Sequence, residues 1–120
     1  MATLKPTLTL TNADSTADAL NISVTDTLTV SEPAVNIARA SIETSAATNI
    51  LTTANSAITY VYLKNVDTTN IITVKNDNGD NFLDLGPGEF SFFPVKGAIG
   101  LEVQANTAAC VLEYGYWSKS

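Results

Sequence analysis

The sequence predicts an all-β fold, an antiparallel β-sandwich that is jelly-roll-like. Apolar and polar residues alternate in several short segments, which is the pattern of half-buried strands. Turn-forming Gly, Pro, Asn and Asp residues separate these segments, and no segment carries apolar residues at helical spacing over three turns. We therefore expect roughly eight to ten short strands and at most a turn or two of helix.

The composition indicates one folded domain that binds neither nucleic acid nor an anionic membrane. A chain of 120 residues is long enough for a single hydrophobic core. Its formal net charge is −6, and its six basic residues are scattered, whereas a nucleic-acid surface needs clustered Lys or Arg. The same acidity repels anionic lipids. The N-terminus has no signal-peptide pattern, so we expect synthesis in the cytoplasm.

The first twelve residues are expected to form an extended arm. Thr7, Thr9 and Thr11 alternate with two leucines, and a proline nearby argues against a central strand. Such a segment is apolar enough to need a partner edge, so we expect it to contact a neighbouring subunit. The arm residues predicted to lie in this interface are Leu4, Pro6, Leu8 and Leu10. Residues 13–120 are expected to form a single β-sandwich domain.

The middle of the chain carries weaker strand signals. Residues 20–25 alternate, and the alternation continues for five more residues, except that Asp26 stands where an apolar residue is expected. This indicates a bulge or a turn. Residues 33–44 change the parity of their apolar positions, which indicates a bend, and residues 49–51 suit a short strand or a connector. The sequence leaves open whether residues 1–55 belong to the same sandwich as the rest.

The strongest strand signal is residues 58–63, which are apolar or aromatic on both parities, as in a central strand covered on both faces. The turns that follow are also marked by composition. An Asn-Gly pair within residues 76–81 predicts a type I′ hairpin loop, and residues 86–88, Gly-Pro-Gly, predict a tight turn. We expect the core to include Tyr60, Tyr62, Phe90 and Phe92. Trp117, near the end of the last strand at 109–117, is left as an aromatic interface candidate.

The residue inventory argues against an enzyme or a metalloprotein, so we expect no catalytic, cofactor or metal site. Histidine is absent, which removes the usual general base and the commonest zinc ligand. The loop at 76–81 is rich in oxygen ligands, but EF-hand spacing would place Val74 and Leu85 at ligand positions. The single cysteine, Cys110, lies in an apolar strand and is expected to be buried and unreactive.

Four segments between residues 57 and 117 consist of distinctive turns and strand ends. They are Tyr60-Val61-Tyr62-Leu63-Lys64-Asn65, Leu85-Gly86-Pro87-Gly88-Glu89-Phe90, Pro94-Val95-Lys96-Gly97 and Glu113-Tyr114-Gly115-Tyr116-Trp117. Through them the chain resembles small virion structural proteins of tailed bacteriophages, notably those of marine cyanobacterial phages. The resemblance implies a capsid decoration or cement protein, a homotrimer made in the host cytoplasm and seated on the capsid exterior, on the major capsid protein.

Two other functions remain open. One is a carbohydrate-binding module of a phage tail or fibre, in which exposed aromatic side chains stack on sugars. The other is a structural subunit of the tail or neck. Glycan binding that depends on Trp117 or a tyrosine would favour the first, and the position of the protein in the virion would separate the second from capsid decoration.

Overall fold

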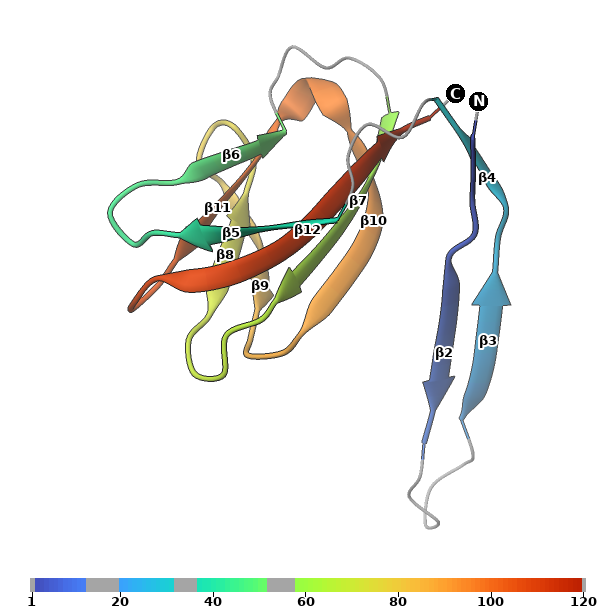
Figure 1. Ribbon diagram of the computed structural model, residues 1–120, viewed down its shortest axis with the longest axis horizontal. Coiled ribbons are helices and arrows are strands. Elements are labelled where there is room, and N and C mark those ends of the chain that lie inside the picture. Colours follow the sequence, from blue (N-terminus) through green and yellow to red (C-terminus); the bar gives the residue numbers. More distant parts are fainter. Residues whose placement is uncertain (1, 13–19, 32–36, 52–57, 120) are drawn as a thin grey trace.

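The computed structural model of the chain describes residues 2–12, 20–31, 37–51 and 58–119 (Figure 1). Eight strands build a two-layered sandwich: β5 (Ala38–Ile42), β6 (Thr48–Leu51), β7 (Ile58–Asn65), β8 (Ile72–Lys75), β9 (Asn81–Leu85), β10 (Phe90–Lys96), β11 (Leu101–Ala105) and β12 (Cys110–Ser118). One sheet has the order β10-β7-β12-β5 and the other the order β6-β11-β8-β9, with every pair antiparallel.

The connections between these strands give the sandwich a jelly-roll topology. Only β8 and β9 are consecutive neighbours in one sheet, and every other connection crosses to the opposite sheet. Eight strands wound between two sheets in this way form a jelly roll. A single helical turn, η1 (Gly97–Ile99), joins β10 to β11. The predicted all-β sandwich is therefore confirmed.

The core lies between the two sheets and comes from one parity of each strand. On β7, Val61 and Leu63 point inward and are fully buried, as expected from the period of two along a strand. Cys110 is buried on β12, as predicted from its apolar strand. The core cluster consists of Ile42, Leu51, Val61, Leu63, Ile72, Val74, Leu85, Leu101, Val103, Ala105, Cys110 and Leu112.

A buried amide anchors two loops at the end of β7. Asn65 is fully buried, and its Nδ2 donates to the carbonyl oxygens of Asn70 and Leu85 at 2.8 and 2.9 Å. Its Oδ1 accepts from the backbone N–H of Asp67 at 2.9 Å. Since the amide is satisfied on both sides, its burial carries little desolvation cost, and it holds the loops after β7 and β9 together.

Four further strands form a narrow antiparallel ribbon beside the sandwich (Figure 1). They are β1 (Ala2–Leu4), β2 (Thr7–Thr11), β3 (Asn21–Thr25) and β4 (Leu28–Val30), in which β1 pairs with β4 and β2 with β3. The ribbon kinks where Pro6 lacks an N–H to donate and where the side chain of Asp26 accepts from the backbone of Thr27 at 2.7 Å. These breaks raise the number of described strands to twelve, above the expected eight to ten.

The first half of the chain is thus divided between the ribbon and the sandwich. Strands β5 and β6 belong to the two sheets, whereas residues 21–30 pair with the N-terminal arm and not with the sheets. The predicted interruption at Asp26 is confirmed as the break between β3 and β4. The predicted bulge or bend in residues 33–44 falls in part on residues 32–36, which lie outside the described part of the chain. Within the described part, Ala38–Ile42 pairs with β12 without a register shift, so β5 itself contains no bulge.

The two glycine-marked turns have different outcomes. At the first, the N–H of Gly79 bonds to the carbonyl of Asn76, and Gly79 has φ 85° while none of the described non-glycine residues has positive φ. This is a three-residue loop with a glycine bulge, so the predicted type I′ turn, which needs positive φ at Asn78 as well, is wrong. At the second, the predicted tight turn is confirmed, and Pro87 and Gly88 (φ 75°) occupy the central positions of a type II turn.

Candidate functional site

The ribbon carries all its large apolar side chains beyond the kink on one face. In the register of β2 and β3, Leu8 stands opposite Val24 and Leu10 opposite Ile22. Residues directly opposite in an antiparallel pair share a face, so these four side chains form two adjacent rows. We call them, together with Leu20 at the start of the returning strand, the ribbon face. The other face is formed by Thr7, Thr9, Thr11, Asn21, Ser23 and Thr25.

The ribbon's apolar side is buried at its base and exposed beyond the kink. At its base, Val30 is only 2% exposed and forms a bridge with Lys119, and Ser31 N–H donates to Ser118 O at 2.9 Å. Further along, the five residues of the ribbon face are 41–55% exposed. The ribbon is therefore packed on the sandwich at its base alone, and its apolar surface faces water beyond the kink.

A groove of about 600 Å³ separates the near part of the ribbon from the outer face of the sheet β10-β7-β12-β5. The ribbon contributes Leu4, Pro6, Leu8 and Val24 among its lining residues, and the sheet contributes Tyr62, Phe90, Phe92 and Trp117. The lining is thus mainly apolar and aromatic. Such a groove suits an apolar or aromatic partner better than an ion or a phosphate.

The sheet side of the groove is an aromatic surface. Phe92 stacks on Tyr60 with ring centroids 6.3 Å apart and an interplanar angle of 12°. Tyr60 is 8% exposed, but Phe92 is 37% and Phe90 63% exposed. The expectation that these phenylalanines are core residues is therefore wrong, because the inward parity of β10 belongs to Phe93 and Val95, which pack against the core cluster.

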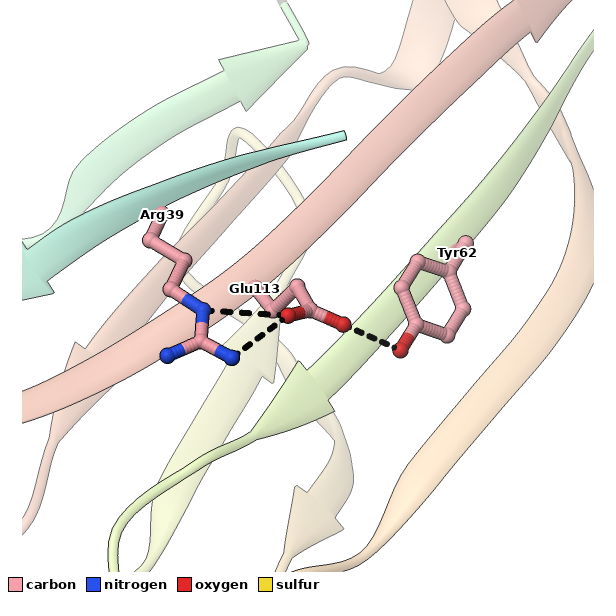
Figure 2. A network of polar contacts seen from close by, with 3 residues as sticks. All are labelled: Arg39, Tyr62 and Glu113. Atoms are coloured by element: carbon pink, nitrogen blue, oxygen red, sulfur yellow. Dashed lines mark hydrogen bonds and ion pairs between the residues drawn. The ribbon is translucent and has the colours of Figure 1, made fainter. Parts of the chain in front are cut away.

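A polar network crosses the same outer face (Figure 2). Glu113 lies opposite Arg39 in the register, and its Oε2 accepts from Arg39 Nε at 3.0 Å while its Oε1 accepts from the Tyr62 hydroxyl at 2.8 Å. Burial and the neighbouring carboxylate raise the pKa of Tyr62 to about 12. The hydrogen bonds from Tyr62 and Arg39 lower the pKa of Glu113. This network fixes an ionised carboxylate, and it contains neither a nucleophile nor a general base that titrates near neutrality.

Polar side chains that could bind a metal ion stabilise a turn instead. In the loop at 76–81, Asn76 Oδ1 accepts from the backbone N–H groups of Asn78 and Asp80 at 3.0 and 2.9 Å, so this oxygen holds the turn. Within the described ranges, no three His, Cys, Asp or Glu side chains lie close enough to hold a metal ion. No described helix is long and apolar enough to cross a membrane. The ribbon face and the groove, which expose apolar and aromatic side chains, form the candidate functional site.

The predicted interface residues can now be placed. Leu4, Pro6, Leu8 and Trp117 all line the groove, and Leu10 lies further along the ribbon face. The sequence reasoning did not connect this set with Val24 and Ile22, which complete the face from the second strand. The signal for them was present, since residues 20–25 and 7–11 show the same alternation of apolar and small polar residues.

Comparison of the chain with models of known protein families, with curated proteins and with solved structures finds no match.

Proposed function

We propose that this chain is a non-enzymatic structural protein of a virus particle, a decoration or cement protein on the outer surface of the major capsid protein shell. In this role it forms a homo-oligomer, a trimer, and stabilises the shell by bridging its subunits. The observation that carries the proposal is the ribbon, whose apolar side is packed at its base and exposed beyond the kink. An exposed apolar face of this kind marks a protein–protein contact.

Two further considerations support the assignment. The jelly-roll sandwich is an architecture that viral capsid proteins use, although lectins use it too, and this support rests on analogy of fold. The resemblance of residues 57–117 to phage virion proteins points to the capsid in particular. The net charge of −6 disfavours contact with packaged nucleic acid, and this supports a position on the exterior of the shell.

A binding experiment with capsid shells tests the proposal. Shells freed of this protein are mixed with increasing amounts of the purified chain and sedimented. We expect saturable binding at a fixed ratio to the major capsid protein and a higher temperature of shell disruption. Isolated tails serve as the control and are expected to bind none. Failure to bind shells, or preferential binding to tails, would contradict capsid decoration and favour a tail or neck subunit.

The aromatic lining of the groove favours one alternative function, carbohydrate binding by a tail or fibre module. Tyr62, Phe92 and Trp117 present aromatic surface on which a sugar ring stacks. A glycan array tests this alternative, with Trp117→Ala as the variant and Phe82→Ala, an exposed aromatic residue outside the groove lining, as the control. Binding to a defined glycan that Trp117→Ala abolishes and Phe82→Ala retains would support it.

A further inference from the structure

The ribbon face is a sheet surface without a second layer. Its apolar rows are backed by a polar face of Thr, Ser and Asn, which is the pattern of a sheet with one side on a core and the other in water. An isolated two-stranded hairpin is marginally stable in water and gains stability when its apolar side is packed. We propose that the ribbon face is covered by the ribbon face of another copy of this chain. This inference rests on the self-association in the proposed function, but neither on a trimer nor on attachment to a capsid, because a face that packs on the same face of another copy joins chains in pairs.

The chain's own sandwich leaves most of the ribbon face uncovered. Of the five residues of the ribbon face, Leu8 and Val24 line the groove, and their side chains remain 47% and 55% exposed. Leu10 and Ile22, one row further from the kink, are outside the groove lining and are 44% and 41% exposed. All these side chains lie on one face. A second ribbon that packs on Leu10 and Ile22 therefore also reaches the inner row, which lines the groove.

The area of the ribbon face fits a pair of copies. At exposures of 41–55%, its five residues leave roughly 400 Å² of apolar surface in water, which is the size of the largest apolar patch on a typical monomer, and such patches often bind a partner. Two such faces in contact bury about 800 Å² of apolar surface, and since interfaces are roughly 60% apolar, the total is about 1,300 Å². This lies within the range of a stable, specific interface, roughly 1,200–2,000 Å².

The distribution of charge also allows a second copy to bind here. None of the five residues of the ribbon face is charged, and the described charges of the ribbon, Lys5 and Asp26, lie at the kink. Two chains of charge −6 repel one another at long range, and salt screens this repulsion over about 8 Å at physiological ionic strength. Added salt is therefore expected to strengthen the association, whereas it would weaken a contact made by opposite charges.

The test measures the molar mass of the purified full-length chain by sedimentation equilibrium over a range of concentrations. The variant Leu10→Thr with Ile22→Thr removes the outer apolar row and places at both positions a β-branched residue that suits a strand. The control, Thr9→Ser with Ser23→Thr, exchanges a cross-strand pair on the opposite face of the ribbon. We expect the wild type and the control to form assemblies of more than one chain. The dissociation constant of the variant is expected to be higher by about a hundredfold or more.

A cross-linking measurement guards against a variant whose ribbon fails to form. The variant Leu10→Cys is expected to join two copies through a short thiol cross-linker, and the control Thr9→Cys is not. The native Cys110 is buried and does not take part. A wild type that is monomeric at every concentration, or an oligomer that neither responds to the variant nor cross-links through position 10, would overturn the inference. Monomers that bind shells would remove the self-association and leave the attachment to the capsid standing, and oligomers that bind no shells would remove that attachment alone.

Discussion

The hydroxyl of Tyr62 donates a hydrogen bond of 2.8 Å to Glu113, diagonally across the neighbouring strands β7 and β12. The residue directly opposite Tyr62 is Gly115, where a Cβ atom would lie 2.9 Å from Cδ1 of Ile37 and 3.1 Å from the ring of Trp117. Glycine at this position therefore lets these two side chains approach the strand on the face that carries the network. The network and the aromatic surface share one sheet face.

Removal of the Tyr62 hydroxyl is expected to change stability at high pH. Because folding raises the pKa of this phenol from 10.0 to about 12, its contribution is present below pH 10 and is lost as the pH rises towards 12. The variant Tyr62→Phe is expected to lack this loss of stability at high pH. At neutral pH its free energy of unfolding is expected to be lower by about 1 kcal/mol, because the variant lacks the hydrogen bond to Glu113. Urea unfolding measured across this pH range checks it, and identical alkaline profiles for both proteins would contradict it.

Replacement of the buried amide is expected to destabilise the sandwich strongly. Asn65→Ala leaves the carbonyls of Asn70 and Leu85 and the N–H of Asp67 without this partner, at a cost of roughly 2–4 kcal/mol in the free energy of unfolding. The control Asn78→Ala, at an exposed position of the 76–81 loop, is expected to change it by less than about 0.5 kcal/mol. A loss below about 1 kcal/mol for Asn65→Ala would show that the loops hold without the amide.

One hydroxyl in the sandwich is expected to be dispensable. The Oγ of Ser91 on β10 is buried and makes no hydrogen bond with the described residues. Since an unpaired buried hydroxyl is unfavourable, Ser91→Ala is expected to leave the free energy of unfolding unchanged or raise it by up to about 1 kcal/mol. Ser41→Ala, at an exposed position of β5, is the reference. Denaturant unfolding of both variants checks this, and clear destabilisation by Ser91→Ala would reveal a bonding role for the hydroxyl.

The single cysteine is expected to be unreactive in the folded protein. Cys110 is 1% exposed, its Sγ contacts the carbonyl of Ala108 at 3.4 Å, and burial, with the nearby charge of Asp67, raises the pKa of its thiol. The raised pKa keeps the fraction of thiolate small, and burial keeps the reagent from the sulfur atom. A thiol reagent at neutral pH should therefore react slowly with the native protein and rapidly after unfolding. Complete native modification within minutes would contradict this.

The period of two in the sequence was sufficient to predict the fold class, but not which parity faces the core. In β7 both parities are apolar or aromatic, and the inner one, with Val61 and Leu63, is identified only by the packing of the second sheet. Phe90 and Phe92 were misassigned for the same reason. Hydrophobicity alone does not separate an aromatic residue in the core from one on an outer face that lies beneath a ribbon.

The candidate site was predictable in part. The alternation of Leu8 and Leu10 beside Pro6 marked an edge segment that needs a partner, and the structure pairs this segment with residues 21–25 of the same chain. The pairing itself has no local signal, because residues 13–19 between the two strands lie in a polar run typical of any loop. The hairpin turn at Gly79 was misassigned because Asn-Gly suits both a two-residue loop and a three-residue loop with a bulge.

Cryo-electron microscopy of the virus particle, at a resolution that traces the chain, shows whether the chain is a structural component of the capsid exterior. We expect a jelly-roll density on the outer surface of the major capsid protein shell, with the ribbons of neighbouring copies in contact through Leu10 and Ile22. Absence of this density from the shell, or its presence in the tail or neck, would contradict the proposed function.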